Sequence, residues 1–235
     1  MTRHEASALA YLEANPLHHM NMIQPIRRGS VEVLAVNSRG VLLLEQVSGA
    51  YMLTVRAAQH AAEFLNLIEK ASVMVVHQEW LVAAAARRFG LRSVMRCYQA
   101  AWLHPAPPAL PETTYRVETL GPDRADDIQA LYSHDMGRAY IEGRLLAGEM
   151  FGAFKDGELA GFIGLHEEGS MGMLEVLPAF RRQGVATVLM AHLCALLMER
   201  GLAPFSQFTT LNVASRKLHE AMGFSISSDI LYWMD

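Results

Sequence analysis

The sequence predicts an α+β protein with a mixed, mostly antiparallel sheet flanked by helices, preceded by a smaller α/β domain. Three observations support this class. Short strand-like segments joined by tight turns such as Asp156-Gly157 form a meander. Strands then alternate with helices of 3.6-residue apolar spacing toward the C-terminus. A proline-rich stretch near the middle separates two such blocks.

Composition excludes several classes of protein. Of the 235 residues 51% are apolar and 19% are charged, which is too much apolar surface for a disordered chain. The longest run without charge, residues 183–198, is too short to cross a bilayer, and the N-terminus does not resemble a secretion signal. Cys97 and Cys194 have no paired spacing. We therefore expect a cytoplasmic protein without disulfides, metal or membrane contact. The net charge of −4 does not indicate nucleic-acid binding.

Charge and proline content indicate two domains. Residues 1–111 carry ten Lys/Arg and seven Asp/Glu, whereas residues 112–235 carry ten and seventeen. Four of the seven residues from Pro105 to Pro111 are proline, which prevents a helix or a central strand. The predicted domains are 1–103 and 115–235, with a linker at 104–114.

The expected elements follow from apolar spacing and turn residues. In the first domain we expect helices at 6–14, 58–70 and 79–89 and strands at 31–36, 40–46, 50–55, 72–76 and 93–102. In the second we expect helices at 123–132, 137–146, 185–200 and 214–222 and strands at 115–118, 150–154, 159–165, 171–177, 205–210 and 226–233. Adjacent His18 and His19 lack a further ligand at metal spacing, so residues 18–22 are interpreted as a surface or interface segment.

The segment from residue 174 to residue 186 contains the clearest indication of a binding site. A strand ends at Pro178, passes Arg181 and Arg182, and enters a helix at Gly184. The start of a helix has unpaired N–H groups and a partial positive charge, and a glycine lets an anion approach the backbone. This pattern favours a phosphate-binding loop. On the short string alone, a plain turn with two solvated arginines remains an alternative.

This segment resembles the acyl-CoA-binding motif of the GCN5-related N-acetyltransferases, the GNAT superfamily. The matching positions are Val176, Pro178, Arg181, Gly184 and Ala186. Residues 212–224, which run from an asparagine to Gly-Phe, resemble the second motif of the same family. The order of expected elements over residues 115–235 also fits the GNAT fold.

Two finer resemblances extend this interpretation. Residues 172–176 and 232–234 resemble the FR47-like branch, which is related to the glycine N-acyltransferases. The N-terminal half, with residues 11–16 and its own order of strands and helices, resembles a degenerate GNAT-like domain. Its corresponding loop, residues 54–58, has no glycine, so we expect no cofactor there.

The resemblance implies a set of residues that bind acetyl-CoA. Loop amides would hold the pyrophosphate, and the preceding strand would pair with the pantetheine arm. The residues so assigned are Leu174, Glu175, Val176, Arg181, Arg182, Gln183, Gly184, Val185, Ala186, Thr187, Asn212 and Ser215. Asn212 also fits a helix-capping residue.

The catalytic assignments are His219 and Glu168. A primary amine must lose a proton before it attacks a thioester, and the leaving thiolate benefits from an acid. In the family a tyrosine usually supplies that acid, and here His219 stands in its place, with packing as the alternative role.

The family's base positions hold Ser170 and Gln207, so the nearby candidates are His166, Glu167 and Glu168 in the preceding turn, with solvation as their alternative role, and Glu168 is the one assigned. Glu175, whose direction the sequence does not give, and a base acting through water are further alternatives.

The sequence therefore predicts an acetyl-CoA-dependent N-acetyltransferase acting on a primary amine of a small molecule or peptide. A non-catalytic CoA-binding or sensor module and an acyltransferase for longer acyl donors are the alternatives. We expect a monomer or homodimer.

Overall fold

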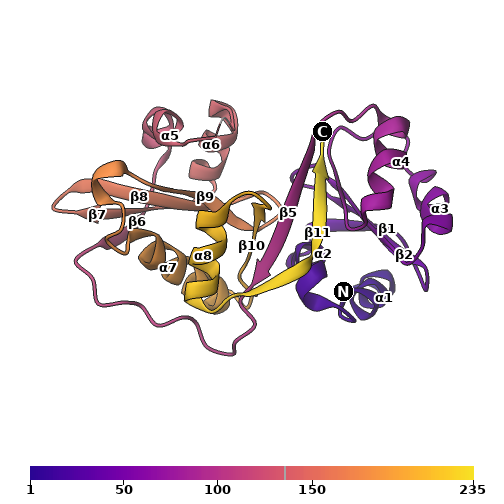
Figure 1. Ribbon diagram of the computed structural model, residues 1–235, viewed down its shortest axis with the longest axis horizontal. Helices are drawn as coiled ribbons and strands as arrows, with labels where there is room; N and C mark the ends of the chain where they lie inside the picture. The colour runs from indigo at the N-terminus through magenta and orange to yellow at the C-terminus, as the bar shows by residue number, and fades with distance from the viewer. Residues whose placement is uncertain (135) are drawn as a thin grey trace. The chain divides into compact units, whose positions relative to one another are not determined.

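The computed structural model describes residues 1–134 and 136–235, which divide into two compact units (Figure 1). Unit 1 contains Met1–Ala101, Gln207–Glu220 and Phe224–Asp235, and unit 2 contains Trp102–Ser206 and Ala221–Gly223. The last strand and most of the last helix thus share a compact unit with the first hundred residues. The assignment of residues 115–235 to one domain stays a prediction.

Unit 1 is built on strands in the order β1-β2-β3-β4-β11-β5. Their bounds are β1 (Val31–Asn37), β2 (Gly40–Glu45), β3 (Tyr51–Val55), β4 (Met74–Val76), β5 (Val94–Ala101) and β11 (Ser225–Met234). The first three form an antiparallel meander, and β4 runs parallel to β3. Strand β11 is antiparallel to both β4 and β5, so the end of the chain completes the middle of this sheet.

Unit 1 also contains helices. They are α1 (Arg3–Leu12), α2 (Pro16–Arg28), η1 (Ala58–His60), α3 (Ala61–Leu65), α4 (Glu79–Phe89) and α8 (Val213–Met222), the last two residues of which belong to unit 2. Of these, α1, α2, α3 and α4 pack on the strands of the unit. Helix α1 begins with a reciprocal capping box between Thr2 and Glu5. Phe64 of α3 is fully buried in a cluster with Leu53 and Met74, so α3 is fixed by tertiary packing despite its five residues.

Unit 2 holds an antiparallel meander followed by a long helix. Its elements are β6 (Arg116–Thr119), η2 (Pro122–Arg124), α5 (Ala125–Leu131), α6 (Arg138–Leu146), β7 (Met150–Lys155), β8 (Glu158–Leu165), β9 (Met171–Val176), η3 (Pro178–Phe180) and α7 (Val185–Glu199). Strand β10 (Phe205–Thr209) starts in this unit and pairs in parallel with β9 through Ser206 and Met171.

Helices lie on both faces of the unit 2 sheet, with α5 and α6 over one face and α7 over the other (Figure 1). Phe162 and Met173 pack with Ile128 and Ile141 beneath α5 and α6. Helix α7 is apolar nearly all round, which fits a helix that packs along β7, β8 and β9. Gly161 permits this packing, because an added Cβ there would lie 3.1 Å from a methyl carbon of Val185.

The predicted class, an α+β protein with a mixed sheet flanked by helices, is confirmed. Residues 102–115, which include the proline-rich stretch, form neither helix nor strand. The helix expected at 58–70 is shorter, because α3 ends at Leu65 and is preceded by a single 3₁₀ turn. In the part of the chain that the structure describes, no helix combines the length and apolarity that crossing a membrane requires.

One element was not predicted. Residues 18–22 were expected at a surface or interface, and this expectation is wrong, because they lie in α2 and are buried. Asn15 caps this helix by accepting from the N–H of His18. The side-chain amide of Gln99 in β5 donates to the main-chain oxygens of Leu17 and His18 at 2.7 and 2.9 Å. These polar contacts from a strand distant in sequence hold the histidine-rich segment inside the unit.

Three histidine rings meet inside unit 1. The ring centroids of His18, His19 and His77 lie 4.9 to 5.2 Å apart. Burial, together with repulsion from His18, lowers the pKa of His19 to about 4, and burial lowers the pKa of His18 and His77 as well. The folded protein therefore keeps these imidazoles neutral at pH 7.

The free energy of unfolding is expected to fall as the pH drops from 7 to 5. The unfolded chain binds a proton at His19 with a pKa near 6.5, whereas the folded chain does so only near 4. The stabilisation that comes from keeping His19 neutral is complete above pH 6.5 and is lost as the pH falls toward 4. At pH 5 the loss in the free energy of unfolding is about 2 kcal/mol for His19 alone. Urea denaturation of the full chain at both pH values measures it.

A His19→Gln variant should lose about 2 kcal/mol less than the wild type over this interval, because its amide does not titrate. His4→Gln, at an exposed position, is the control and should follow the wild type. An unchanged pH dependence in His19→Gln would contradict the account.

Candidate functional site

The N-terminus of α7 offers main-chain donors. Gly184 precedes the helix with a left-handed backbone (φ +83°), and no side chain caps it. The first four N–H groups of a helix have no partner within it, so those of residues 184–187 point outward with the positive end of the helix dipole. An added Cβ at Gly184 would meet nothing within 4 Å, so the space beside this glycine is open.

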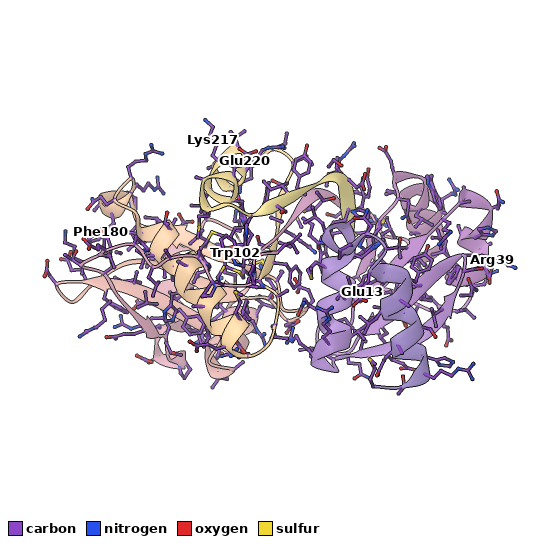
Figure 2. The ribbon with its side chains drawn as sticks, turned by 90° about the horizontal axis from the view of Figure 1, so that it is seen from below. Glu13, Arg39, Trp102, Phe180, Lys217 and Glu220 are labelled. Carbon is purple, nitrogen blue, oxygen red and sulfur yellow. The ribbon has the colours of Figure 1, made fainter. Side chains whose placement is uncertain are left out.

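The loop before α7 is held by its own polar contacts. The Nε–H of Arg181 donates to the main-chain oxygen of Val176 at 3.1 Å. The side-chain amide of Gln183 donates to the oxygen of Ala179 at 2.9 Å. Figure 2 labels Phe180, the last residue of the 3₁₀ turn in this loop. Arg181 and Arg182 are exposed and place two positive charges beside the helix start.

Strand β9 contains a bulge. Gly172 pairs with Gly164 and Glu175 with Phe162, so two residues of β9 stand opposite one residue of β8. Met173, in the bulge, has φ +49°, which is strained for a side chain of this kind. Among the described strand pairs, β10 joins β9 only at Met171, so residues 172–176 keep an edge without a strand partner. An extended ligand can pair with such an edge.

The Glu175 side chain holds a neighbouring segment. Its carboxylate accepts from the main-chain N–H of Ser133 at 3.2 Å and lies 3.6 Å from a guanidinium nitrogen of Arg181. It is 14% exposed. Burial, with the charge of Glu175, raises the pKa of Tyr132 to about 12. The side chain of Glu175 thus fixes the loop around residue 133, and its main chain contributes to the strand edge.

A polar cluster lies where β9 begins. The Ser170 hydroxyl donates a short hydrogen bond to Glu168, and both side chains are buried. Tyr140 of α6 lies 2.8 Å from Nδ1 of His166. Burial, and next the charge of Glu168, raises the pKa of Tyr140, so its phenol stays protonated at pH 7.

Gly172 makes room for this cluster. A Cβ at Gly172 would overlap Nε2 of His166. The histidine ring therefore lies against the strand immediately before the bulge. Glu168, expected on sequence grounds as a candidate base, belongs to an organised polar cluster rather than to a solvated turn. Tyr140 was missed, because its sequence neighbours in α6 give no sign of its partner.

In unit 1, the residues from the second motif serve the structure of α8. The Asn212 side chain accepts from the N–H of Ser215 at 2.9 Å, as a helix-capping residue does. His219 is 4% exposed, with ring centroids of Phe208 and Phe224 each 5.0 Å away. Its Nδ1 lies 2.7 Å from the main-chain oxygen of Ser215. Exposed Lys217 and Glu220, labelled in Figure 2, stand on the same helix.

Burial lowers the pKa of His219, which keeps its ring neutral at pH 7. The Nδ1–H then donates to Ser215, so the other nitrogen carries a lone pair rather than a proton. These contacts favour the packing role that the sequence left open. A catalytic role for His219, like the cofactor roles of Asn212 and Ser215, stays a prediction.

Together, the unit 2 features can bind an elongated anionic ligand. The amides of α7 and the two arginines attract phosphate, and the edge of β9 offers main-chain groups to a chain extending from it. The polar cluster at the start of β9 supplies proton acceptors. Among the described residues, no group of three histidine, cysteine or acidic side chains is arranged to hold a metal ion.

Comparison with solved structures shows a shared fold. A Drosophila protein matches with a TM-score of 0.67 and 16% identity over 98% of this chain and 86% of its own. A GCN5-related N-acetyltransferase from Kribbella flavida matches with a TM-score of 0.58 and 12% identity over 93% and 95%. A GNAT-family protein from Novosphingobium aromaticivorans matches with a TM-score of 0.57 and 18% identity over 93% and 95%.

Part of the sequence matches a family model. Residues 114–224 match the model of the acetyltransferase (GNAT) family. No curated protein matches the chain by sequence. This part of the chain, just under half of its length, thus matches the GNAT family, and the match supports an acyltransferase. The matched region contains β9, the arginine loop, α7 and α8.

Replacing Gly172 by alanine is expected to displace the His166 ring, because the added Cβ would overlap it. Loss of the Tyr140–His166 hydrogen bond and a destabilisation of about 1–3 kcal/mol should follow. Urea denaturation and the nitrogen chemical shifts of the His166 ring measure both effects.

The matched control is Gly143→Ala on α6, where an added Cβ meets nothing within 4 Å. It should be neutral or stabilising by about 0.5–1 kcal/mol, because alanine favours a helix over glycine. An intact Tyr140–His166 bond in Gly172→Ala would show that the glycine does not position the ring.

Proposed function

We propose that the protein is an acetyl-CoA-dependent N-acetyltransferase that transfers the acetyl group to a primary amine. The observation that carries the proposal is the open N-terminus of α7 next to the unpartnered edge of β9. The family match supports acyl transfer in general, and the site supports a CoA thioester as the donor. The acceptor is a small molecule or a peptide amine.

The pyrophosphate of CoA would lie against the amides of residues 184–187. Left-handed backbone at Arg182 and Gly184 turns the loop so that the helix start is exposed. Arg181 and Arg182 add charge, and the open space in front of Gly184 admits a phosphate. The loop is braced by Arg181 and Gln183, so little rearrangement is needed on binding.

The pantetheine arm would run along β9 as an added strand. Leu174 and Val176 would offer main-chain groups on the edge that β10 leaves open. A main-chain N–H near Val176 would then donate to the thioester oxygen as negative charge develops on it. The acetyl carbon would lie alongside the β9 bulge, close in sequence to the polar cluster.

Glu168 is the proposed general base. The attacking amine must give up a proton, its nitrogen then bonds to the thioester carbon, and the carbon–sulfur bond breaks to release CoA thiolate. Ser170 and the neighbouring cluster hold the Glu168 carboxylate in place. Because Glu168 is 6% exposed, the proton would reach it through a water molecule. The same water can return the proton to the leaving thiolate.

Other properties are proposed from sequence. The N-terminal domain would lack a cofactor site. In support, the Gln78 side chain accepts from the N–H of Val55 at 3.1 Å and donates to the Thr54 hydroxyl at 2.9 Å, and so occupies polar groups at the ends of β3 and β4. A cytoplasmic location and a monomer or homodimer complete the proposal. Membership of the FR47-like branch rests on residues 172–176 and 232–234.

Gly184→Trp is expected to abolish CoA binding. An indole would project into the space in front of the α7 amides, and the left-handed backbone would be strained as well. Titration calorimetry with CoA measures the loss, which should exceed 100-fold in affinity.

Gly201→Trp is the matched control. It lies at the other end of α7, has φ +74°, and an added Cβ there also meets nothing within 4 Å. It should bind CoA like the wild type. Equal affinities of the two variants would contradict the placement of the pyrophosphate.

Glu168→Gln is expected to lower kcat about 100-fold while leaving the KM for acetyl-CoA unchanged, because a base acts on the amine and not on the donor. Release of free thiol, measured with an amine identified in an acceptor screen, gives both constants. Glu158→Gln, at the start of β8 and exposed, is the control. A Glu168→Gln enzyme within twofold of the wild type would exclude Glu168 as the base.

A further inference from the structure

Unit 1 contains a cavity that the proposed acyl transfer does not use. Its volume is about 490 Å³, within the range of small-molecule sites. It lies beside α2, the C-terminal ends of β3 and β4, and a bulge of β11. Every residue that lines it belongs to unit 1.

The cavity opens where two parallel strands separate. Strands β3 and β4 pair as far as Leu53 and Val76. Beyond this pair, the side chain of Gln78 bonds to the main chain of Val55 and to the hydroxyl of Thr54. These bonds hold the separated strand ends in place, so the cavity between them is a stable part of the structure.

Among the residues that the structure describes, one buried histidine nitrogen of the cavity lining has no hydrogen-bond partner. His19 bonds to Leu12 and Thr54 through its two nitrogens, and His77 bonds to Leu53 and Asn21 through its own. By contrast, Nδ1 of His18 is buried with no hydrogen-bond partner, and the side chain is 5% exposed. Burial lowers the pKa of His18, so its ring is neutral, and a neutral imidazole nitrogen with a lone pair can accept an N–H from a ligand.

Two opposite charges line the cavity. Asp229 lies in the β11 bulge, where Ile226 and Ile230 are four positions apart but pair with β5 residues only two positions apart. Its charge acts on His18 and His19. Arg56 lies over the ring of Tyr11, 5.5 Å from its centroid. Within the part of the chain that the structure describes, neither charge forms a salt bridge.

The other carboxylate in the lining is already engaged, because Glu79 lies 3.5 Å from Arg96. Trp80 also lines the cavity and exposes 39% of its surface, which provides an aromatic face for an apolar group. The available chemistry is therefore one cation, one anion, one buried acceptor and an aromatic surface.

We propose that this cavity binds a small zwitterion of the α-amino-acid type. The ligand's carboxylate would pair with Arg56, and its ammonium group would pair with Asp229 and donate to Nδ1 of His18. Its side chain would lie against Trp80. A ligand with one charge would leave either Arg56 or Asp229 without a partner. The inference does not depend on the proposed acyl transfer.

Titration calorimetry on the full chain tests the proposal with three probes that share one carbon skeleton. L-Phenylalanine carries both charges, 2-phenylethylamine only the ammonium group and 3-phenylpropionate only the carboxylate. L-Phenylalanine should bind one molecule per chain, and each single-charge probe should bind at least tenfold more weakly. Glycine and L-leucine test whether the two charges suffice without an aromatic side chain.

Asp229→Asn and Arg56→Gln should each weaken binding of L-phenylalanine at least tenfold, and His18→Phe should weaken it while keeping a ring in place. Glu69→Gln and Arg87→Gln, exposed positions of unit 1 outside the cavity, are the charge-matched controls and should bind like the wild type. Three results would overturn the proposal: no binding of any of the three amino acids, a single-charge probe that binds as tightly as L-phenylalanine, or binding that survives both charge variants.

Discussion

The left-handed backbone at Met173 is the constraint on which the candidate active site depends. A positive φ at a residue with a long side chain costs about 1–2 kcal/mol, and Met173 offsets this by burying its side chain among Phe162 and the residues of α5 and α6. The bulge shifts the pairing of β9 by one residue. This shift sets the direction of Glu175, whose side chain accepts from the main chain of Ser133. The edge of β9 beyond Met171 has no strand partner among the described pairs.

The bulge also links two parts of unit 2 that the sequence separates. Gly172 precedes it and leaves room for His166, which in turn bonds to Tyr140 on α6. The strand edge, the proton acceptors and the helix over the sheet are thus positioned by one irregular stretch of β9. Donor binding and proton transfer are therefore expected to depend on the same few residues.

Local signals predicted the parts of the structure that depend on neighbouring residues. Glycine at a helix start, Asp-Gly at a hairpin and proline in a linker act within a few residues, so the start of α7 and the meander of unit 2 could be predicted. Helix α2 could not, because its histidines are buried through contacts from Gln99, some eighty residues away. The direction of Glu175 was equally inaccessible, since it depends on the bulge, and Tyr140 meets His166 only through the fold.

Amide hydrogen exchange of the full chain, with and without CoA, tests the central claim most directly. The account predicts that exchange slows on CoA binding at the main-chain N–H groups of residues 184–187 and along residues 174–176. Slower exchange at the helix start but not at β9 would show that CoA binds the helix start without pairing with the edge of β9. Exchange unchanged in both segments under saturating CoA would contradict the account.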